Sequence, residues 1–288
     1  MTGVHPVAPE TYVVDAQMLG MPGSMSVYVI DAAEPVILDS GPATGAEHVL
    51  DGLEECGVDP TEVAYLVQTH VHLDHAGAAG TLAEACPDAE VVVHERGVEY
   101  LTDAEKLSRL YESAREAVGD DIASGYGEPS RVPRDRCRVV SGGESLDLGD
   151  RQLDLVHAPG HAPHQICALD SRTATLFSAD AAGMFLFDQL LPTTPAPDFD
   201  LQQSLDTIER LRALDPETIC YGHFGAREDA GAALEAYADL LPNWVAAVEA
   251  AVASTGSDDV DAVVDELSAD WPSPTIERDV VGVLATDR

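Results

Sequence analysis

Three histidines and an aspartate stand within six consecutive positions of this chain, at His70, His72, Asp74 and His75. Imidazole nitrogens and carboxylate oxygens are the ligands that Zn²⁺ prefers, and iron or manganese also accepts this combination. A surface loop that is merely rich in histidine is the alternative interpretation. The density of ligands in the HxHxDH pattern favours a metal site, whose chemistry would be the activation of water and the polarisation of a bond.

The residues around this motif predict how its ligands are held. An apolar run over residues 63–67 is typical of a buried strand. Alternation along the extended segment that follows places the first two histidines on one side, whereas Asp74 and His75 fall where a helix begins near Ala76. The motif therefore predicts two adjacent metal positions at the end of a strand.

Three later segments offer further ligands, each at the end of a predicted strand. His161 follows the strand-like run 152–157, Asp180 follows the apolar run 176–179, and His223 follows the run 218–221. A Pro-Gly pair or a single glycine turns the chain just before each histidine and presents it at the tip of the strand. Four strand ends that all deliver ligands favour a scaffold built on sheets, with the site along one edge.

The order of these motifs resembles the metallo-β-lactamase superfamily, over roughly Val13 to Gly225. The motifs that carry the resemblance are HxHxDH, GH, AD and GH, together with the early turn Asp39-Ser40-Gly41. The resemblance implies an α/β protein of the four-layer αββα sandwich type, with metals at one edge and Asp39 supporting the site from behind. It also implies two Zn²⁺ ions per chain, or iron or manganese in their place.

The same resemblance implies a role for each ligand. His70, His72 and His161 would hold one metal, Asp74, His75 and His223 the other, and Asp180 would bridge the two. Two cations that share a water lower its pKa, so that a metal-bridging hydroxide becomes the nucleophile. Asp74 would be catalytic, because it could orient this water and pass its proton to the leaving group. His164 is the second catalytic candidate: it contacts the substrate's oxyanion, donates to a metal ligand, or is a structural histidine.

The segment Gly160-His161-Ala162-Pro163-His164 and the complete ligand set are most similar to the glyoxalase II group, which hydrolyses thioesters of hydroxyacids. We therefore predict hydrolysis of an ester, thioester or lactone in a small-molecule substrate. A glutathione thioester in particular is not supported, because Arg227 and Arg278 are the few basic candidates for its carboxylate in the C-terminal region.

Other functions remain open at this point. N-acyl homoserine lactonases share the ligand set but often place a tyrosine where this chain has Gly183. β-Lactam hydrolysis is less favoured, because many such enzymes have a cysteine at the position of Asp180. Persulfide dioxygenases keep similar motifs around a single iron, and a non-catalytic metal-binding scaffold is the remaining alternative. The number of metals separates the hydrolase from the dioxygenase, and turnover of any ester excludes the scaffold.

The charge of the chain restricts its partners. There are 52 acidic against 15 basic residues, a formal net charge of −37, and Lys106 is the only lysine. Polyphosphates and nucleic acids would be repelled, so we expect no nucleic-acid partner. Salt should relieve the self-repulsion of so many carboxylates. The composition resembles proteins adapted to a salt-saturated cytoplasm and predicts a haloarchaeal source, with an ordinary acidic mesophile protein as the alternative.

The pattern of elements predicts one large domain with two additions. Strands are expected near 12–16, 26–30, 36–38, 63–69, 90–94, 139–140, 152–157, 165–169, 173–178 and 218–221, and helices over 46–56, 77–86, 104–118 and 201–214. We predict a catalytic domain over 1–225, with a helical insert at about 95–136 that is a candidate lid. A helical extension over 226–288 would complete the pocket or form a homodimer contact, with Trp244 and Trp271 as anchors or as core residues.

The location is expected to be cytoplasmic. The first ten residues lack the basic start and apolar core of a signal peptide. No apolar stretch reaches the length of a membrane span. The five cysteines are widely spaced without a CxxC pair, which is typical of reduced thiols.

Overall fold

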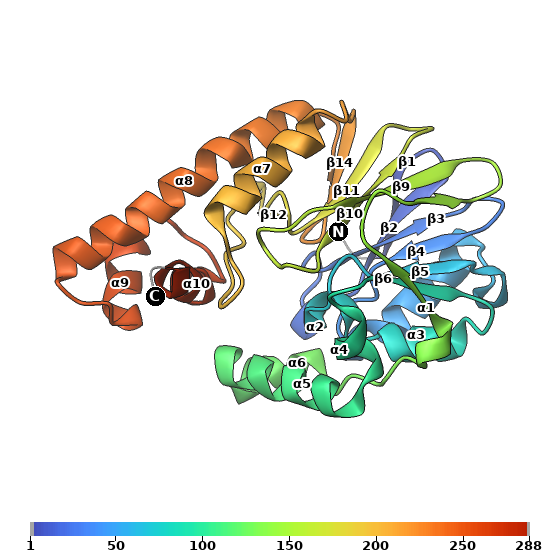
Figure 1. Ribbon diagram of the computed structural model, residues 1–288, viewed down its shortest axis with the longest axis horizontal. Helices are drawn as coiled ribbons and strands as arrows, with labels where there is room; N and C mark the ends of the chain where they lie inside the picture. Colours follow the sequence, from blue (N-terminus) through green and yellow to red (C-terminus); the bar gives the residue numbers. More distant parts are fainter. Residues whose placement is uncertain (1–2, 287–288) are drawn as a thin grey trace.

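Two β-sheets pack face to face, and helices cover both outer faces (Figure 1). The computed structural model describes residues 3–286, apart from the side chains of residues 117, 118 and 121. The layers confirm the expected αββα sandwich. The order of the strands within each layer decides which side chains can meet at an edge.

The first sheet has seven strands in chain order. They are β1 (Val4–Ala8), β2 (Thr11–Asp15), β3 (Ser26–Ile30), β4 (Val36–Leu38), β5 (Tyr65–Val67), β6 (Glu90–His94) and β7 (Cys137–Val140). Pairing is antiparallel from β1 to β4 and parallel from β4 to β7. Because the carboxyl ends of parallel strands lie at one edge, the segments after β4 and β5 bring Asp39 and the HxHxDH motif to the same edge.

The second sheet has six strands. Their order is β15 (Ala226–Arg227), β14 (Thr218–Tyr221), β11 (Thr175–Ala179), β10 (Ile166–Asp170), β9 (Gln152–His157) and β8 (Ser145–Asp147). The parallel pair β11 and β14 delivers Asp180 and His223 side by side. A separate hairpin, β12 (Met184–Leu186) and β13 (Gln189–Leu191), follows the aspartate.

Three apolar layers hold the sandwich together. Buried side chains such as Ile30, Leu38 and Phe177 fill the space between the sheets. Helices α1 (Ala46–Cys56) and α3 (Ala79–Ala85) cover the first sheet, and α7 (Leu201–Arg212) and α8 (Ala230–Thr255) cover the second. Strands β3, β4 and β11 are buried at every position, which is why they read as continuous apolar runs rather than as alternating ones.

The predicted insert is helical. Helices α4 (Val98–Thr102), α5 (Ala104–Val118) and α6 (Asp120–Tyr126) lie between β6 and β7. Helix α6 contacts the loops that precede α1, where the Thr44 hydroxyl donates to the Gly125 carbonyl at 2.6 Å. A Cβ at position 125 would stand 2.1 Å from the end of the Leu19 side chain, so a larger residue would require Leu19 to move. The insert is thereby fixed against the edge of the sheet that carries the site.

The C-terminal extension consists of α8, α9 (Val260–Leu267) and α10 (Ile276–Thr286). Trp244 is 1% exposed and its ring lies 5.2 Å from that of Trp271 in an edge-to-face arrangement. Trp244 is therefore a core residue, as the second of the two interpretations expected. Within residues 3–286, no helix combines the length and the apolarity that a bilayer crossing would need.

The structure differs from the sequence prediction at one helix start and in several short strands. Helix α2 (Leu73–Ala76) begins earlier than the expected start near Ala76 and is separate from α3, so Asp74 lies within its first turn. Strands β1, β8 and β15 and the hairpin β12–β13 were not predicted. β1 contains a proline and lies at the edge of its sheet, and three-residue strands are too short to show a periodic pattern.

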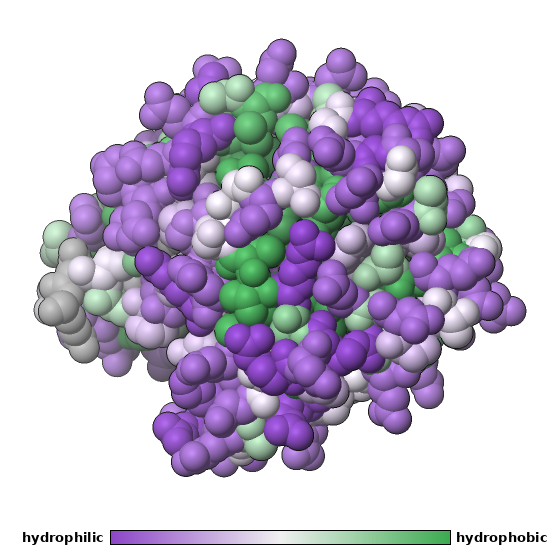
Figure 2. All heavy atoms as spheres, turned by 45° about the vertical axis from the view of Figure 1, so that its right-hand side comes forward, coloured by the Kyte–Doolittle hydropathy of each residue, from purple (hydrophilic) through white to green (hydrophobic). Residues whose placement is uncertain are grey.

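Hydrophilic residues cover most of the face that Figure 2 presents, with a narrower band of apolar residues across it. This polarity agrees with the excess of carboxylates in the sequence.

Candidate metal centre

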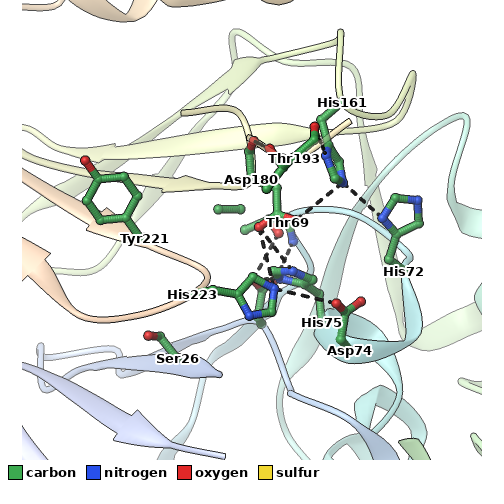
Figure 3. Close-up of polar contacts among 12 residues, drawn as sticks. Ser26, Thr69, His72, Asp74, His75, His161, Asp180, Thr193, Tyr221 and His223 are labelled. Atoms are coloured by element: carbon green, nitrogen blue, oxygen red, sulfur yellow. Dashed lines mark hydrogen bonds and ion pairs between the residues drawn. The ribbon is translucent and has the colours of Figure 1, made fainter. Parts of the chain in front are cut away.

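The seven predicted metal ligands meet at the shared edge of the two sheets; Figure 3 labels all of them except His70. His70 and His72 follow β5, Asp74 and His75 lie on α2, His161 follows β9, Asp180 follows β11, and His223 follows β14. All of these residues are buried except His72, which is partly exposed. The ligating atoms form three groups in which all atoms lie within 4.8 Å of one another. The groups are His70, His72 and His161; His70, His75 and Asp180; and Asp74, His75 and His223.

The first group has the spacing of nitrogen ligands around one cation. His161 Nε2 lies 3.0 Å from His72 Nδ1. Two nitrogens at 2.0–2.1 Å from a tetrahedral zinc would be about 3.3 Å apart. His70 Nε2 completes this group, and it is buried without a hydrogen-bond partner among the described residues.

Asp180 stands between the first group and the third, which consists of Asp74, His75 and His223. Its Oδ2 lies 3.5 Å from His161 Nε2, whereas its Oδ1 lies 3.4 Å from His75 Nε2 and 3.8 Å from His223 Nε2. Within the third group, Asp74 Oδ2 lies 3.5 Å from His223 Nε2. Each oxygen of the Asp180 carboxylate thus faces a different group of histidines, which is the arrangement that a bridging ligand needs.

Each of four histidines is fixed by the ring nitrogen that faces away from the centre. His161 Nδ1 and His223 Nδ1 lie 3.1 and 2.7 Å from the backbone carbonyl oxygens of Thr193 and Ser24. An N–H that donates to a carbonyl leaves the lone pair on Nε2, which points toward the centre. His75 Nδ1 lies 2.9 Å from Asp39 Oδ2, and His70 Nδ1 lies 3.1 Å from the Thr69 hydroxyl.

The sequence could not reveal the two backbone partners, because any residue type supplies a carbonyl. Asp39, in contrast, was expected behind the site and is found there. Its φ of 63° is in the left-handed region, which costs energy for a residue with a Cβ. That conformation aims the carboxylate at the Thr69 amide, 2.8 Å away, and at His75. Asp39 therefore joins the ends of β4 and β5 and orients one ligand.

Replacing Asp39 by alanine should weaken metal binding by about 10- to 100-fold and lower the free energy of unfolding by roughly 1–3 kcal/mol. The reason is that His75 loses its orienting partner and the buried Thr69 amide loses its acceptor. Competition with a chromophoric chelator measures the first effect and urea unfolding measures the second.

The matched control is Asp59→Ala. Asp59 also accepts a threonine amide, that of Thr61 at 2.8 Å, but it is exposed and lies on a turn outside the site. An equal loss of metal affinity in the two variants would contradict the orienting role of Asp39.

Burial and neighbouring charges set the protonation of the ligands. Burial lowers the pKa of His70 far below its ordinary value and that of His161 to about 3, so both are neutral at neutral pH. Burial opposes the charged form of Asp74, but the charge of His75 and a hydrogen bond from His223 hold the pKa of this carboxyl well below its usual range. Neutral imidazoles and ionised carboxylates are the states that bind a cation.

His75 differs from the other imidazoles. Burial lowers its pKa, yet the charges of Asp180, Asp74 and Asp39 outweigh burial and raise the pKa well above the ordinary value. Without a cation, a proton on His75 compensates part of this negative charge. A bound cation would displace that proton.

Unpaired buried atoms provide a test of whether a metal fits here. Among the described side chains, His70 Nε2, His75 Nε2 and Asp180 Oδ1 are buried without a hydrogen-bond partner. Buried polar atoms without a partner are costly, and these three belong to one of the groups of converging atoms. A divalent cation would satisfy them together, so the residues present fit such an ion.

His164 lies beside the ligands but outside the three groups. It is 6% exposed, its Nδ1 has no hydrogen-bond partner, and its ring centroid lies 6.3 Å from that of His70 and 6.0 Å from that of His72. Burial lowers its pKa to about 3, so the ring is neutral. A neutral imidazole can donate one hydrogen bond to a substrate.

Comparison with known proteins agrees with this geometry. The model of the metallo-beta-lactamase superfamily matches residues 20–223. The metallo-beta-lactamase fold-containing protein ST1585 of Sulfurisphaera tokodaii is 33% identical over 161 residues, which is 56% of this chain and 60% of that protein. Its solved structure superposes with a TM-score of 0.72 at 24% identity and covers 99% of both chains, which shows a common fold.

Two further relatives have names that state an activity. The acyl-coenzyme A thioesterase MBLAC2 of Gallus gallus is 32% identical over 162 residues, or 55% of each chain. The N-acyl homoserine lactonase AttM of Azorhizobium caulinodans is 30% identical over 175 residues, or 58% of this chain and 60% of the lactonase. The matched segments thus span little more than half the length of these curated relatives. The fold, the family match over residues 20–223 and the converging ligands together establish that the chain belongs to the metallo-β-lactamase superfamily.

Proposed function

We propose that this protein is a binuclear metal-dependent hydrolase of an ester, thioester or lactone, similar to the glyoxalase II group. One observation carries the proposal: the carboxylate of Asp180 directs one oxygen toward each of two groups of histidines. Two divalent cations, when bound, would supply Lewis acidity and make hydroxide available near neutral pH. The names of two relatives, a thioesterase and a lactonase, agree with attack on a carbonyl carbon.

The residues of the chain would complete the reaction. Asp74 is buried, and its carboxylate is ionised at neutral pH, so it can orient the attacking water and accept its proton. The same group would then pass the proton to the leaving alcohol or thiol. His164 would donate a hydrogen bond to the oxyanion that develops on the substrate.

A lactonase is the second candidate, supported by the AttM relative. The tyrosine that such enzymes often carry three residues after the bridging aspartate has no room in this chain. A Cβ at Gly183 would lie 2.5 Å from the Tyr237 ring, and the φ of Gly183 is 82°. The Tyr237 hydroxyl contacts Thr193 at 3.1 Å instead. This packing favours an open-chain ester or thioester over a lactone.

Metal analysis of the purified protein, paired with a panel of thioesters, esters and lactones, tests the proposal. Two zinc ions per chain with turnover of a thioester or an ester is the expected result. One iron per chain with oxygen uptake in the presence of a persulfide would place the protein with the dioxygenases. Metal binding without turnover of any substrate would favour the non-catalytic scaffold.

We also propose that the protein works in a salt-rich cytoplasm. Its five cysteines are free, and three of them are buried, which suits a reducing compartment. The net charge of −37 should make the folded state depend on screening. The melting temperature is therefore expected to rise by roughly 10 °C between 0.1 and 3 M KCl, as measured by circular dichroism. A melting temperature that is unchanged or lower in high salt would contradict salt adaptation.

A further inference from the structure

A cavity of about 340 Å³ lies between the hairpin β12–β13 and the C-terminal helices. Its walls come from β13, from α8, from the segment that joins α9 to α10, and from α10 itself. These helices form the group at the left of Figure 1. None of the seven predicted metal ligands lines the cavity, and His164 does not line it either. The cavity is therefore a separate site from the metal centre.

Both tryptophans of the chain line this cavity, although aromatic residues make up only 5% of the sequence. Trp244 is 1% exposed and Trp271 is partly exposed, and their ring centroids lie 5.2 Å apart in an edge-to-face arrangement. Leu190, Leu191 and Ile276 add aliphatic surface. A partly exposed indole beside an apolar space is a surface that the apolar body of a ligand can cover.

The charged residues that line the cavity are all acidic. They are Asp270 and Asp279, and no lysine, arginine or histidine of the described residues joins them. Asp270 is exposed at the position before Trp271, and its carboxylate forms no hydrogen bond or ion pair with the described residues. An anionic ligand would meet only repulsion here, whereas a cation would meet an unpaired carboxylate and an aromatic ring.

Asp279 also favours a positive charge in the cavity. It is 0% exposed, and its carboxylate accepts hydrogen bonds from the Thr194 amide at 2.8 Å and from the Thr275 hydroxyl at 2.7 Å. Burial raises its pKa, and the charge of Arg278, 3.9 Å away, lowers the pKa to a smaller extent, so that the pKa is raised overall. A cation bound in the cavity would stabilise the ionised form of this carboxyl.

The cavity shares one wall with the metal centre. Pro192 lines the cavity, and the next residue, Thr193, supplies the carbonyl that lies 3.1 Å from His161 Nδ1. Trp244 Nε1 donates a hydrogen bond to the Thr194 hydroxyl at 3.1 Å. A ligand in the cavity would therefore contact the residues that support one metal ligand, and it would leave the reacting atoms free.

We propose that this cavity binds an organic ammonium ion that carries an apolar body. The body would pack on the apolar wall, and the ammonium group would lie against Asp270 and the indole of Trp271. An apolar body without a charge would leave the carboxylates uncompensated, and a small inorganic cation would leave the apolar wall uncovered. The proposal does not depend on the hydrolase function, because none of the predicted catalytic residues lines the cavity.

Isothermal titration of the zinc-loaded protein with three probes tests the proposal. Benzyltrimethylammonium has both the charge and the apolar body, tetramethylammonium has only the charge, and 2-phenylethanol has the body without the charge. The first probe should bind about tenfold more tightly than either of the other two. Its nitrogen has no lone pair, so it cannot ligate zinc. Intrinsic fluorescence should report the same affinity, because both tryptophans line the cavity.

Variants of the two residues assigned to the ligand locate the site. Trp271→Leu should weaken the binding of benzyltrimethylammonium about tenfold, and Trp271→Phe should keep most of the affinity, because it retains an aromatic face. Asp270→Asn should weaken the binding of this cation roughly threefold and leave 2-phenylethanol unaffected. The matched control is Asp265→Asn, which removes an exposed carboxylate of α9 that does not line the cavity. This control should bind all three probes as the wild type does.

Two results would overturn the proposal. If 2-phenylethanol binds the wild type as tightly as benzyltrimethylammonium does, the cavity does not recognise a cation. If Asp270→Asn and Asp265→Asn weaken the binding of the cation equally, the cation responds to the net charge of −37 and not to the cavity. The measurements need no turnover, so the absence of hydrolysis would leave this inference unaffected.

Discussion

Replacing Asp180 by alanine is expected to leave one metal ion per chain instead of two and to reduce kcat roughly 1000-fold, which corresponds to about 4 kcal/mol. The carboxylate approaches His161 with one oxygen and His75 and His223 with the other, at 3.4–3.8 Å, so no neighbouring ligand can substitute for it. Metal content by mass spectrometry and steady-state kinetics on the best thioester measure the two effects. The fold should survive, because removal of the charge also relieves the crowding of carboxylates.

Asp170→Ala is the informative comparison. Asp170 is the last residue of β10 and lies at the end of that strand farther from the candidate site. It is buried and forms an ion pair with Arg151 at 3.2 Å. Loss of that carboxylate leaves the buried guanidinium with fewer partners and should cost stability up to about 3 kcal/mol, with metal content unchanged. Two metals per chain in Asp180→Ala would show that Asp180 does not bridge.

Asp74→Asn is expected to lower kcat by about 100- to 10,000-fold while most of the metal is retained. The amide keeps an oxygen that can contact a cation, but it cannot accept the proton of the attacking water. Asparagine is isosteric with aspartate, so at this buried position in the first turn of α2 the substitution changes charge and not shape. The rate and the metal content are measured on the same preparation, at saturating zinc.

The ratio of kcat to bound metal decides the role of Asp74. A proton-transfer role predicts a rate that falls much further than the metal content. If activity per bound metal equals that of the wild type, Asp74 is a ligand only.

Most of the site could be predicted from the sequence, because its ligands are polar residues at the ends of apolar runs. His161, Asp180 and His223 each follow such a run, and parallel pairing of β11 and β14 brings the last two together. The roles of these residues remain predictions until metal is measured. Their convergence, however, is a property of the fold.

The surroundings of the site were harder to predict, for physical reasons. The carbonyl groups of Ser24 and Thr193 carry no residue signature. Tyr126 comes from the insert and Arg278 from the C-terminal extension, and both act electrostatically on Asp74 and Asp180. No local pattern in the sequence reports such an approach between distant segments. In the sequence, Arg227 and Arg278 were equivalent candidates for binding the carboxylate of a glutathione thioester. In the structure they differ, because Arg227 forms a close ion pair with Asp229.

Helix α10 packs on Thr194, whose amide donates a hydrogen bond to Asp279. This contact affects the order in which the site forms during synthesis. A ribosome releases the chain from its N-terminus, so all the strands that carry ligands emerge before residues 276–286. Until α10 has been synthesised, the Thr194 amide lacks its acceptor on Asp279 and the backbone that holds His161 lacks its support. The nascent protein therefore contains every predicted metal ligand before it contains the helix that packs behind them.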